Sequence, residues 1–384
     1  MSTRHSLFKV SVISFSLLAL LGQNAFADSI DLSGLGVTTS QHDEISEGMQ
    51  SFAGSLLTAI PEATTQNNVW ADAYIGKLFP SLIPHIGAGF SFGLTQLDMS
   101  GLKTAADTLV SDYNSLSSLT TITDTLGITD FSLESISFTI PETFFLPSLS
   151  LDLRIGGVLL PFDIGICAMM TNPNLSAIDT SDPTTLTNAS SGIDFDLSGF
   201  KGTVNYMVLG ADIRYCIYEG NIILPKISVG GGYYYAKGSF GFTSGNEDET
   251  TVANVGVSYD SHIVFAQIEA SKNFAIATLF GGLRGVLNST NVAWSWDYTT
   301  DVEVSGVTYT ISDSDSGTES LDTLDTSYIS TIQPQVYLGA GFNFLIFQTA
   351  FNVCTDLKSV CTAVQNQSIS ELSWSGSLSF HAKL

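Results

Sequence analysis

"ELSWSGSLSFHAKL", residues 371–384, carries two kinds of side chain that alternate along the chain. The residues of one set are apolar, and those of the other set are serine, histidine or lysine. Successive residues of a β-strand point to opposite faces, so this segment predicts a strand with one apolar and one polar face. The apolar set is Leu372, Trp374, Leu378, Phe380, Ala382 and Leu384, and the polar set is Ser373, Ser375, Ser377, Ser379, His381 and Lys383.

The same alternation recurs in the segments 84–97, 148–157 and 203–218. The segment 223–242 adds three adjacent tyrosines and a run of glycines, and its tyrosines are typical of an aromatic girdle at a membrane surface. Each segment is long for a strand and has one face that water would not favour. We therefore expect strands that separate two different solvents.

The composition agrees with a membrane environment. Hydrophobic residues make up 44% of the 384 residues and charged residues 13%, which is about half the usual charged share of a soluble protein. A basic start with Arg4 and Lys9, an apolar run at 10–21 and "AFA" at 25–27 predict a cleaved signal peptide over residues 1–27. Its removal would leave 11 basic residues against 37 acidic ones, a formal charge of −26 that argues against a nucleic-acid partner.

No uncharged apolar run after residue 27 approaches the roughly 18 residues that a membrane helix needs. A closed barrel is the other structure that satisfies every backbone group in lipid. We therefore predict an all-β fold, an antiparallel transmembrane β-barrel over 69–384, preceded by an N-terminal helical segment at 28–68. Barrels of this kind usually have an even number of strands, so we expect about 12, within a range of 10 to 14.

Eleven segments are candidate strands, and the twelfth is 131–140, a strand near the mature N-terminus, or one half of a long segment. The eleven are 69–79, 84–97, 148–157, 162–171, 203–218, 223–242, 252–271, 274–298, 327–340, 343–354 and 370–384. Short connections at 156–161, 219–222 and 271–273 are expected on the periplasmic side, and long ones at 172–202, 243–251, 299–326 and 355–369 outside the cell.

The final segment resembles the last strand of bacterial outer-membrane β-barrels, with Leu384 in place of the usual terminal aromatic and Phe380 four residues earlier. The resemblance covers roughly 69–384. It implies a place in the outer membrane, contact with its lipid, and recognition of the last strand by the barrel assembly machinery. A looser resemblance, in overall size and an N-terminal hatch, is to barrels of the long-chain fatty-acid transporter type. The Asn-Pro-Ala hatch motif of that type does not occur in 28–68.

Two segments have helical rather than strand spacing. Apolar residues in 43–59 recur at intervals of three and four, and 102–116 is a second candidate helix. Such helices would plug the lumen, lie in the periplasm or cap a loop. We favour a plug for the first helix, because its apolar stripe needs a surface to pack against.

Charged residues inside the predicted strands are the candidate functional residues. The expected mature chain has three arginines, and two of them occur in an Asp-x-Arg pattern that puts both charges on one face of a strand. That face should be the lumen, because a lipid-facing arginine costs about 2–4 kcal/mol at mid-membrane. The predicted lumen-lining residues are Asp152, Arg154, Asp163, Asp212, Arg214 and Arg284. They would form either a charged constriction that selects solutes or an internal salt-bridge network that braces the barrel.

The remaining motifs are weaker. The acidic stretch 313–325 has Gly317 where a calcium loop has its fifth-position ligand, so we expect a solvated surface loop that, with 246–249, gives the outer face a negative field. Cys354 and Cys361 flank an outer connection and are a candidate disulfide. Cysteine and histidine spacing suggests no metal site, and we expect no cofactor and no enzymatic activity.

Two functions remain open from the sequence. One is a channel or transporter for passive passage of small or amphipathic solutes, hydrophobic ones included. The other is a closed barrel that serves as an adhesin or structural surface protein through its acidic outer loops.

Overall fold

The computed structural model describes residues 39–66, 69–76, 85–117, 140–157, 161–171, 193–197, 200–244, 251–304, 307–324, 332–366 and 372–384. The predicted signal peptide, residues 131–139 of the candidate strand 131–140 and the acidic residues 246–249 lie outside these ranges. None of the described helices is long and apolar enough to span a membrane.

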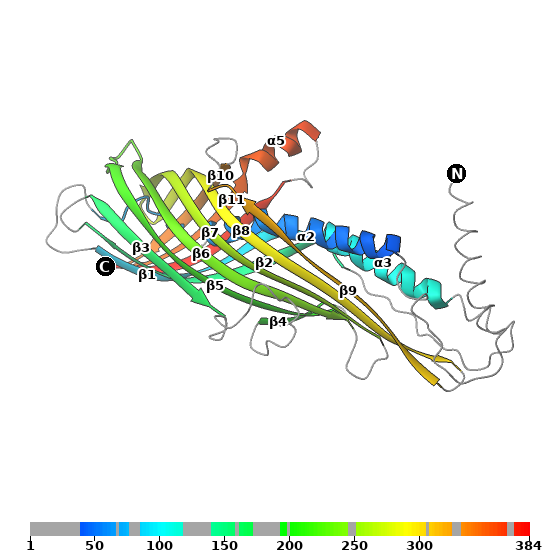
Figure 1. The fold of residues 1–384 in the computed structure, drawn as a ribbon. Helices are drawn as coiled ribbons and strands as arrows, with labels where there is room; N and C mark the ends of the chain where they lie inside the picture. Colours follow the sequence, from blue (N-terminus) through cyan, green and yellow to red (C-terminus); the bar gives the residue numbers. More distant parts are fainter. Residues whose placement is uncertain are drawn as a thin grey trace, which may run out of the picture.

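The described strands form one antiparallel sheet that closes on itself, as predicted (Figure 1). Neighbours follow the order β10-β11-β12-β1-β2-β3-β5-β6-β7-β8-β9, and the pairing of β10 with β8 closes the ring. The sheet has twelve strands among the described residues. Because β4 pairs only with β5 and β9 only with β8, the other ten strands make the closed ring.

The strands differ greatly in length. They are β1 (His85–Asp98), β2 (Thr143–Gly156), β3 (Phe162–Met170), β4 (Ile193–Leu197), β5 (Phe200–Tyr218), β6 (Lys226–Ser244), β7 (Thr251–Phe274), β8 (Ala277–Val304), β9 (Val307–Asp322), β10 (Gln333–Phe344), β11 (Phe347–Asp356) and β12 (Trp374–Lys383).

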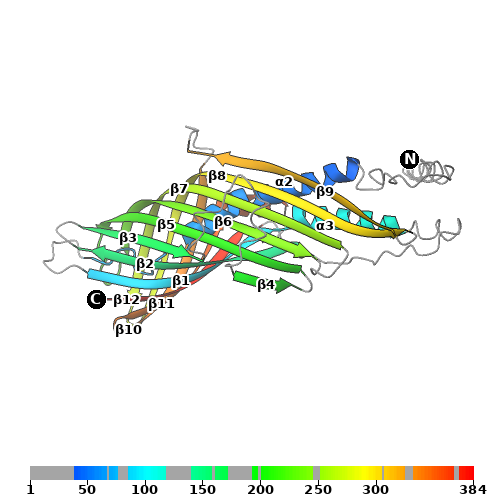
Figure 2. The ribbon, with the colours of Figure 1, turned by 60° about the horizontal axis from the view of Figure 1, so that its bottom comes forward.

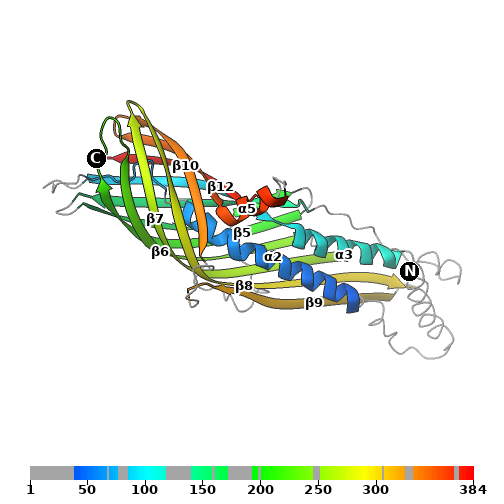
Figure 3. The ribbon, with the colours of Figure 1, turned by 90° about the horizontal axis from the view of Figure 1, so that it is seen from above.

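The wall of the barrel is therefore uneven in height. On the side of β10, β11 and β12 the strands have 10 to 12 residues, while β5 to β8 have 19 to 28. The long strands continue beyond the ring as a curved half-pipe (Figure 3). β9 pairs with the far part of β8 above β10, and β4 pairs with the start of β5 beyond the end of β3 (Figure 2).

The two ends of the barrel are distinct. At one end, called here the short-turn end, β7 and β8 are joined through Ala275 and Ile276, and β10 and β11 through Leu345 and Ile346. Ala275 and Leu345 adopt positive φ angles of 47° and 55° in these tight turns. The first turn, at 275–276, lies three to four residues later than the predicted 271–273. The opposite end, called here the long-connection end, carries the longer excursions.

Side chains alternate across the wall as the sequence predicts. On β2, for example, Leu151, Leu153 and Ile155 are exposed on the outside, while Asp152 and Arg154 are buried inside. The outer face is apolar all round the ring, because lipid and not water is its expected surrounding.

Two helices lie inside the half-pipe and the barrel rather than outside (Figure 3). α2 (Thr39–Gln66) and α3 (Ser100–Ser117) confirm the two predicted helices and are longer than expected. They cross closely at Gly48 and Gly101: a Cβ atom on Gly48 would lie 2.7 Å from the carbonyl oxygen of Gly101. Only glycine permits this approach of two helix backbones.

Residues 69–76 correct the sequence-based expectation. They were predicted to begin the first strand, but they contain no strand and lie buried inside the ring. The wall begins instead at β1. The acidic stretch is a second correction, because most of 313–325 forms β9 and pairs with β8 rather than forming a solvated loop.

Candidate functional site in the barrel lumen

The lumen is crossed near the short-turn end by the chain that follows α2. In this crossing segment, residues 69–76, Trp70 and Tyr74 are among the largest fully buried side chains. Its backbone is bound by wall side chains: Arg214 Nη1 donates to the carbonyl oxygen of Asp72 at 2.9 Å, and Lys226 Nζ to that of Tyr74 at 2.7 Å. The wall thus supplies partners for polar groups that would otherwise be buried alone.

Two acceptors on the wall complete this arrangement. Asp163 Oδ2 accepts from the backbone N–H of Ile75, and Ser271 Oγ accepts from that of Ala73, each at 3.0 Å. Backbone donors and acceptors of the crossing segment are therefore bonded to β3, β5, β6 and β7 at once. These hydrogen bonds to four strands hold the segment in one position across the lumen.

Five buried charges form one network on the inner wall. Arg154 lies 2.6 Å from Asp163 and 2.8 Å from Asp212, and Arg214 lies 2.8 Å from Asp163 and 3.6 Å from Glu269. All five side chains are at most 2% exposed. Buried charges need partners of this kind, since removing a single member leaves another charge uncompensated.

Strand register explains why these charges meet. Asp163 and Arg214 are direct cross-strand partners. Arg154 and Asp212 flank Gly165 on the intervening strand β3. A Cβ atom on Gly165 would lie 2.5 Å from Arg154 Nη2 and 2.6 Å from Asp212 Oδ2, so the glycine leaves the space in which the two side chains join.

Gly89 serves the same purpose on β1. It is the cross-strand partner of both Asp152 and His381, whose carboxylate oxygen and Nε2 lie 3.3 Å apart. The His381 ring stacks on Trp70 of the crossing segment with 3.9 Å between ring centroids. The guanidinium of Arg154 lies 5.7 Å from the centroid of the same indole. Trp70 is therefore held between a cation and a ring from the wall.

Two carboxyl groups of the α2 region are bound in different ways. Asp72 is paired with Lys383 and accepts from Gln348 Nε2 at 3.1 Å. Burial opposes its ionisation, but Lys383 and Lys226 outweigh burial and hold the pKa of Asp72 below its usual range. Glu62 has only neutral partners: Ser375 Oγ donates to it at 2.7 Å and Ser373 Oγ at 3.3 Å.

Burial raises the pKa of Glu62 from 4.5 to about 7, because two hydroxyl donors only partly replace the lost hydration. Glu62 is thus the carboxyl group of α2 whose charge can change near neutral pH. It lies where α2 enters the ring beside β12.

The structure places all six predicted lumen residues on the inner face. Asp152 pairs with His381, and four others belong to the five-charge network. Arg284 lies apart: it donates to Gln267 at 3.0 and 3.1 Å and, through Nη1, to the carbonyl oxygen of Thr65 at 2.8 Å. It therefore binds the C-terminal end of α2.

The sequence-based analysis missed several partners of this site. Alternation placed His381 and Lys383 on the polar face of the last strand, but they were not predicted as lumen-lining residues. Glu269 occupies an inward position of a correctly identified strand, so alternation would have found it as well. Glu62, Trp70 and Asp72 lie on segments whose course through the lumen has no local sequence signal.

The long-connection half of the lumen has a different lining. Here the inner face of the half-pipe is aromatic and aliphatic, and it packs on the apolar stripe of α2 and on α3 in one continuous core. Among described residues the wall contributes Val204, Tyr206, Val208, Tyr234, Phe240, Phe242, Val257, Tyr259, Ile263, Phe265, Val292, Trp294, Trp296 and Tyr298.

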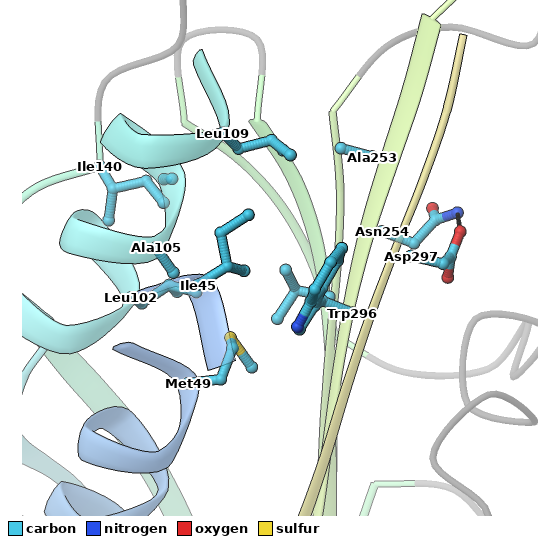
Figure 4. A pocket seen from close by; sticks show the side chains of 12 residues that line it. Ile45, Met49, Leu102, Ala105, Leu109, Ile140, Ala253, Asn254, Trp296 and Asp297 are labelled. Carbon is cyan, nitrogen blue, oxygen red and sulfur yellow. Dashed lines mark hydrogen bonds between the residues drawn. The ribbon is translucent and has the colours of Figure 1, made fainter. Parts of the chain in front are cut away.

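A pocket opens between the two helices and the half-pipe (Figure 4). It has about 420 Å³ of empty volume, part of it open to solvent. Ile45 and Met49 of α2 and Leu102 of α3 face Trp296 of β8 across it. Asn254 and Asp297, joined by a 2.8 Å hydrogen bond, are the polar residues at its edge.

A second apolar pocket of about 370 Å³ lies further along α2, between Ile60 and the wall. The pairing of β2 with β3 begins at Leu151 of β2. On this side, the part of β2 before Leu151 has no strand partner among the described residues. The hydroxyl of Tyr206 bonds the backbone of β2 in place of a neighbouring strand. It accepts from the N–H of Leu149 at 2.5 Å and donates to the carbonyl oxygen of Leu149 at 3.3 Å. A single phenol therefore joins β5 to β2 beside the pocket.

The outer half of α2 is bound to β9 by polar contacts. His42 Nδ1 lies 3.2 Å from Asp313 Oδ2, and Ser46 Oγ donates to Asp315 Oδ2 at 2.5 Å. Gln50 Nε2 donates to Glu319 at 2.7 Å. The acidic residues of β9 thus hold the helix, rather than projecting freely from the surface.

The predicted disulfide is not formed. Cys354 and Cys361 are both free, as are Cys167 and Cys216. The Cys354 side chain is buried on the inner face of β11, and Cys361 is exposed on α5 (Leu357–Asn366), which leaves the wall. Among the described residues no group of three or more His, Cys, Asp or Glu side chains is placed to hold a metal ion.

Comparison with known proteins gives similarity at the level of fold. No protein-family model matches the chain, and no curated protein matches it. Among solved structures, the translocator domain of the autotransporter NalP from Neisseria meningitidis is similar at 10% identity and TM-score 0.32, over 92% of this chain and 99% of that one. A major outer membrane protein from Thermus thermophilus is similar at 9% identity and TM-score 0.27, over 78% and 99%.

A Pseudomonas aeruginosa FadL homologue is similar at 9% identity and TM-score 0.26, over 88% of this chain and 97% of that one. The ring closure, the apolar outer face and the alternation described above define this chain as a β-barrel of the outer-membrane type.

Proposed function

We propose that the protein is an outer-membrane channel for passive passage of small apolar or amphipathic solutes, closed at rest by α2 and the crossing segment. The observation that carries this proposal is the apolar lining of the long-connection half of the lumen. Water-filled barrels have polar interiors, whereas sites for small molecules are concave and mostly apolar.

The lining of the two pockets supports the same class of solute. Both are lined mainly by apolar side chains, as sites for small apolar molecules are. Both lie on the side of α2 that faces β5 to β8. A solute that binds there would gain roughly 25 cal/mol for each Å² of apolar surface removed from water.

Loop length supports an orientation with the long-connection end outside the cell. A solute would then meet the pocket at Trp296 first, follow α2 inward, and reach the crossing segment last. The hydrogen bonds and the Asp72–Lys383 salt bridge that hold this segment would have to break for passage. Outer-membrane lipid, the solute and the assembly machinery that reads β12 are the proposed partners, and we assign no enzymatic role.

The test is entry of N-phenyl-1-naphthylamine, an apolar fluorophore that brightens in lipid, into intact cells that express the protein. We expect faster entry than in cells without it, and a return to the lower rate for Met49→Asp, which puts a charge in the first pocket. The matched control is Thr58→Asp, at an exposed position of the same helix. Equal rates for all four strains, with each variant folded by heat-modifiable migration on a gel, would contradict the proposal.

A closed barrel that acts through its outer surface is the second candidate. The observation that favours it is the number of bonds between the wall and the crossing segment. Planar-bilayer conductance separates the two functions. Current from a chain that lacks residues 28–76, and not from the full chain, would support a channel gated by the plug. Silence from both folded proteins would favour the closed barrel.

A further inference from the structure

α5 is an amphipathic helix whose apolar face is uncovered at its outer end. Its apolar residues Leu357, Val360, Cys361 and Val364 follow the spacing i, i+3, i+4 and i+7 of one helix face. Leu357 and Val360 are half-buried, whereas Cys361 is exposed and Val364 is 71% exposed, so no described part of the chain covers the outer end of this stripe. The other face carries Lys358, Thr362 and Gln365.

The position of α5 matches the outer boundary of the hydrocarbon. A tilted strand of about 9–11 residues crosses the hydrocarbon core, and β11 has 10 residues. Its outward side chains Phe347, Phe351 and Val353 are exposed to the expected lipid. Leu357 continues the same alternation, so the apolar stripe of α5 begins where the lipid-facing row of β11 ends. Figure 1 shows α5 leaving the wall beside β10 and β11 and lying above α2 in this view.

A hollow in the outer wall meets the start of α5. It has about 850 Å³ of empty volume and is open to the surroundings. Its rim is formed by the lipid-facing side chains of Val229, Ile268 and Leu283, which are 37%, 46% and 52% exposed, with Leu357 at the α5 end. The hollow is therefore continuous with both the lipid-facing surface and the helix.

α5 also differs in charge from β9, which lies at the same end of the barrel. The helix has one lysine and no acidic residue, in a chain with a net charge of −24. β9, in contrast, carries Asp313, Asp315 and Glu319. A helix without acidic residues avoids repulsion by anionic lipid headgroups.

We infer that α5 is an interfacial helix that docks on the outer leaflet of the surrounding membrane. Its stripe from Leu357 to Val364 lies among the upper parts of the acyl chains, and a lipid chain fills the hollow below Leu357. Lys358, Thr362 and Gln365 face the headgroups and water. This is the usual placement of a short amphipathic helix with a polar and an apolar face.

The test uses the native Cys361 as a probe. A nitroxide spin label is attached to Cys361 of the full chain in lipid vesicles, and its collisions are measured with oxygen, which concentrates in hydrocarbon, and with a water-soluble nickel chelate. Single cysteines introduced in a Cys361→Ser background, at Val364→Cys, Thr362→Cys and Gln365→Cys, complete one helical turn. The label on Cys361→Ser itself gives the background to subtract.

We expect a several-fold higher ratio of oxygen to nickel collisions at positions 361 and 364 than at 362 and 365. Equal exposure of all four positions to nickel would overturn the inference, since the helix would then stand in water. Protection of 361 and 364 from both reagents would overturn it too. In that case label–label broadening that grows with the protein-to-lipid ratio would identify a second copy as the covering surface.

Discussion

The short-turn half of the lumen is lined by charge, and the long-connection half by aromatic and aliphatic side chains. The apolar half holds α2, and the charged half holds the crossing segment that follows it. In the charged half, wall side chains form hydrogen bonds with individual backbone groups of the crossing segment. In the apolar half, the face of α2 toward β5 to β8 is held by non-directional packing that leaves two pockets, and the polar contacts of the helix are with β9. The contrast shows how one barrel can hold the crossing segment in one position by directional bonds and pack α2 through apolar contacts that do not depend on direction.

The two kinds of contact should respond differently to substitution. Directional bonds between buried charges fail abruptly when one partner is lost. Apolar packing tolerates changes that keep volume. Four predictions follow this contrast, from the largest expected effect to the smallest.

Arg214→Ala should have the largest effect. It removes the partner of Asp163 and Glu269 and the donor to the Asp72 carbonyl, so it leaves buried carboxylates uncompensated. We expect a loss of about 3–5 kcal/mol in the free energy of unfolding, measured by urea titration of the refolded barrel in vesicles. Lys103→Ala, which breaks an exposed pair with Asp107 on α3, is the control and should cost less than about 1 kcal/mol. Equal effects of the two changes would show that the network does not stabilise the closed lumen.

Glu62→Gln tests a buried carboxyl group between the two halves, whose hydrogen-bond partners are uncharged serines. The folded-state pKa of Glu62 is raised from 4.5 to about 7, so the folded protein holds a proton that the unfolded chain has released between those values. Stability should therefore fall as pH rises from about 4.5 to 7 and stay low above it. Glu62→Gln removes this loss and should be more stable than the wild type by up to about 3 kcal/mol at pH 8.

The measurement for Glu62 is urea unfolding at pH 5 and pH 8 for both proteins. The difference between variant and wild type should be larger at pH 8. A difference that is the same at both pH values would mean that Glu62 is ionised throughout.

Met49→Leu tests the apolar half, where we expect a volume-conserving substitution to be tolerated. Met49 is fully buried and lines the first pocket, but its contacts depend on volume and not on direction. We expect a cost below about 1.5 kcal/mol, whereas the equally conservative Arg214→Lys should cost clearly more, because one ammonium cannot reproduce the forked donor of arginine. Paired urea titrations would show it, and a larger cost for Met49→Leu would reverse the ranking.

His42→Ala should have the smallest effect. Its contacts with Asp313 and Asp315 are partly exposed, and such pairs contribute about 1 kcal/mol or less. The change should loosen the outer end of α2 without unfolding the barrel. Hydrogen exchange should therefore quicken at the start of α2 and stay unchanged at Thr64 and Thr65. Faster exchange along the whole helix would mean that the contacts with β9 hold all of α2.

Much of the wall could be predicted from sequence. Alternation placed Asp152, Arg154, Asp212 and Arg214 on the inner face, because strand geometry fixes the direction of successive side chains. The helical spacing of 43–59 likewise indicated α2. These are local rules, and the structure confirms them.

The errors have a common physical origin. The segment 69–79 looks like a strand because it is apolar and short, yet 69–76 is buried by the barrel around it. The acidic stretch 313–325 looks like a solvated loop, yet β8 and α2 give it partners. In both places, neighbours distant in the chain decide the structure.

The sequence by itself determined that this chain forms a closed barrel with an apolar outside, a charged inner face and an amphipathic helix ahead of the first strand. The alternation of apolar and polar residues, the helical spacing and the apolar composition are local features that can be read directly from the sequence. Only the tertiary structure decided that the charges bind the chain after α2, that α2 occupies the lumen, and that Gly165 and Gly89 bring charged partners together. These contacts depend on register around a ring, and ring register is set by many strand pairings together, not by any single segment.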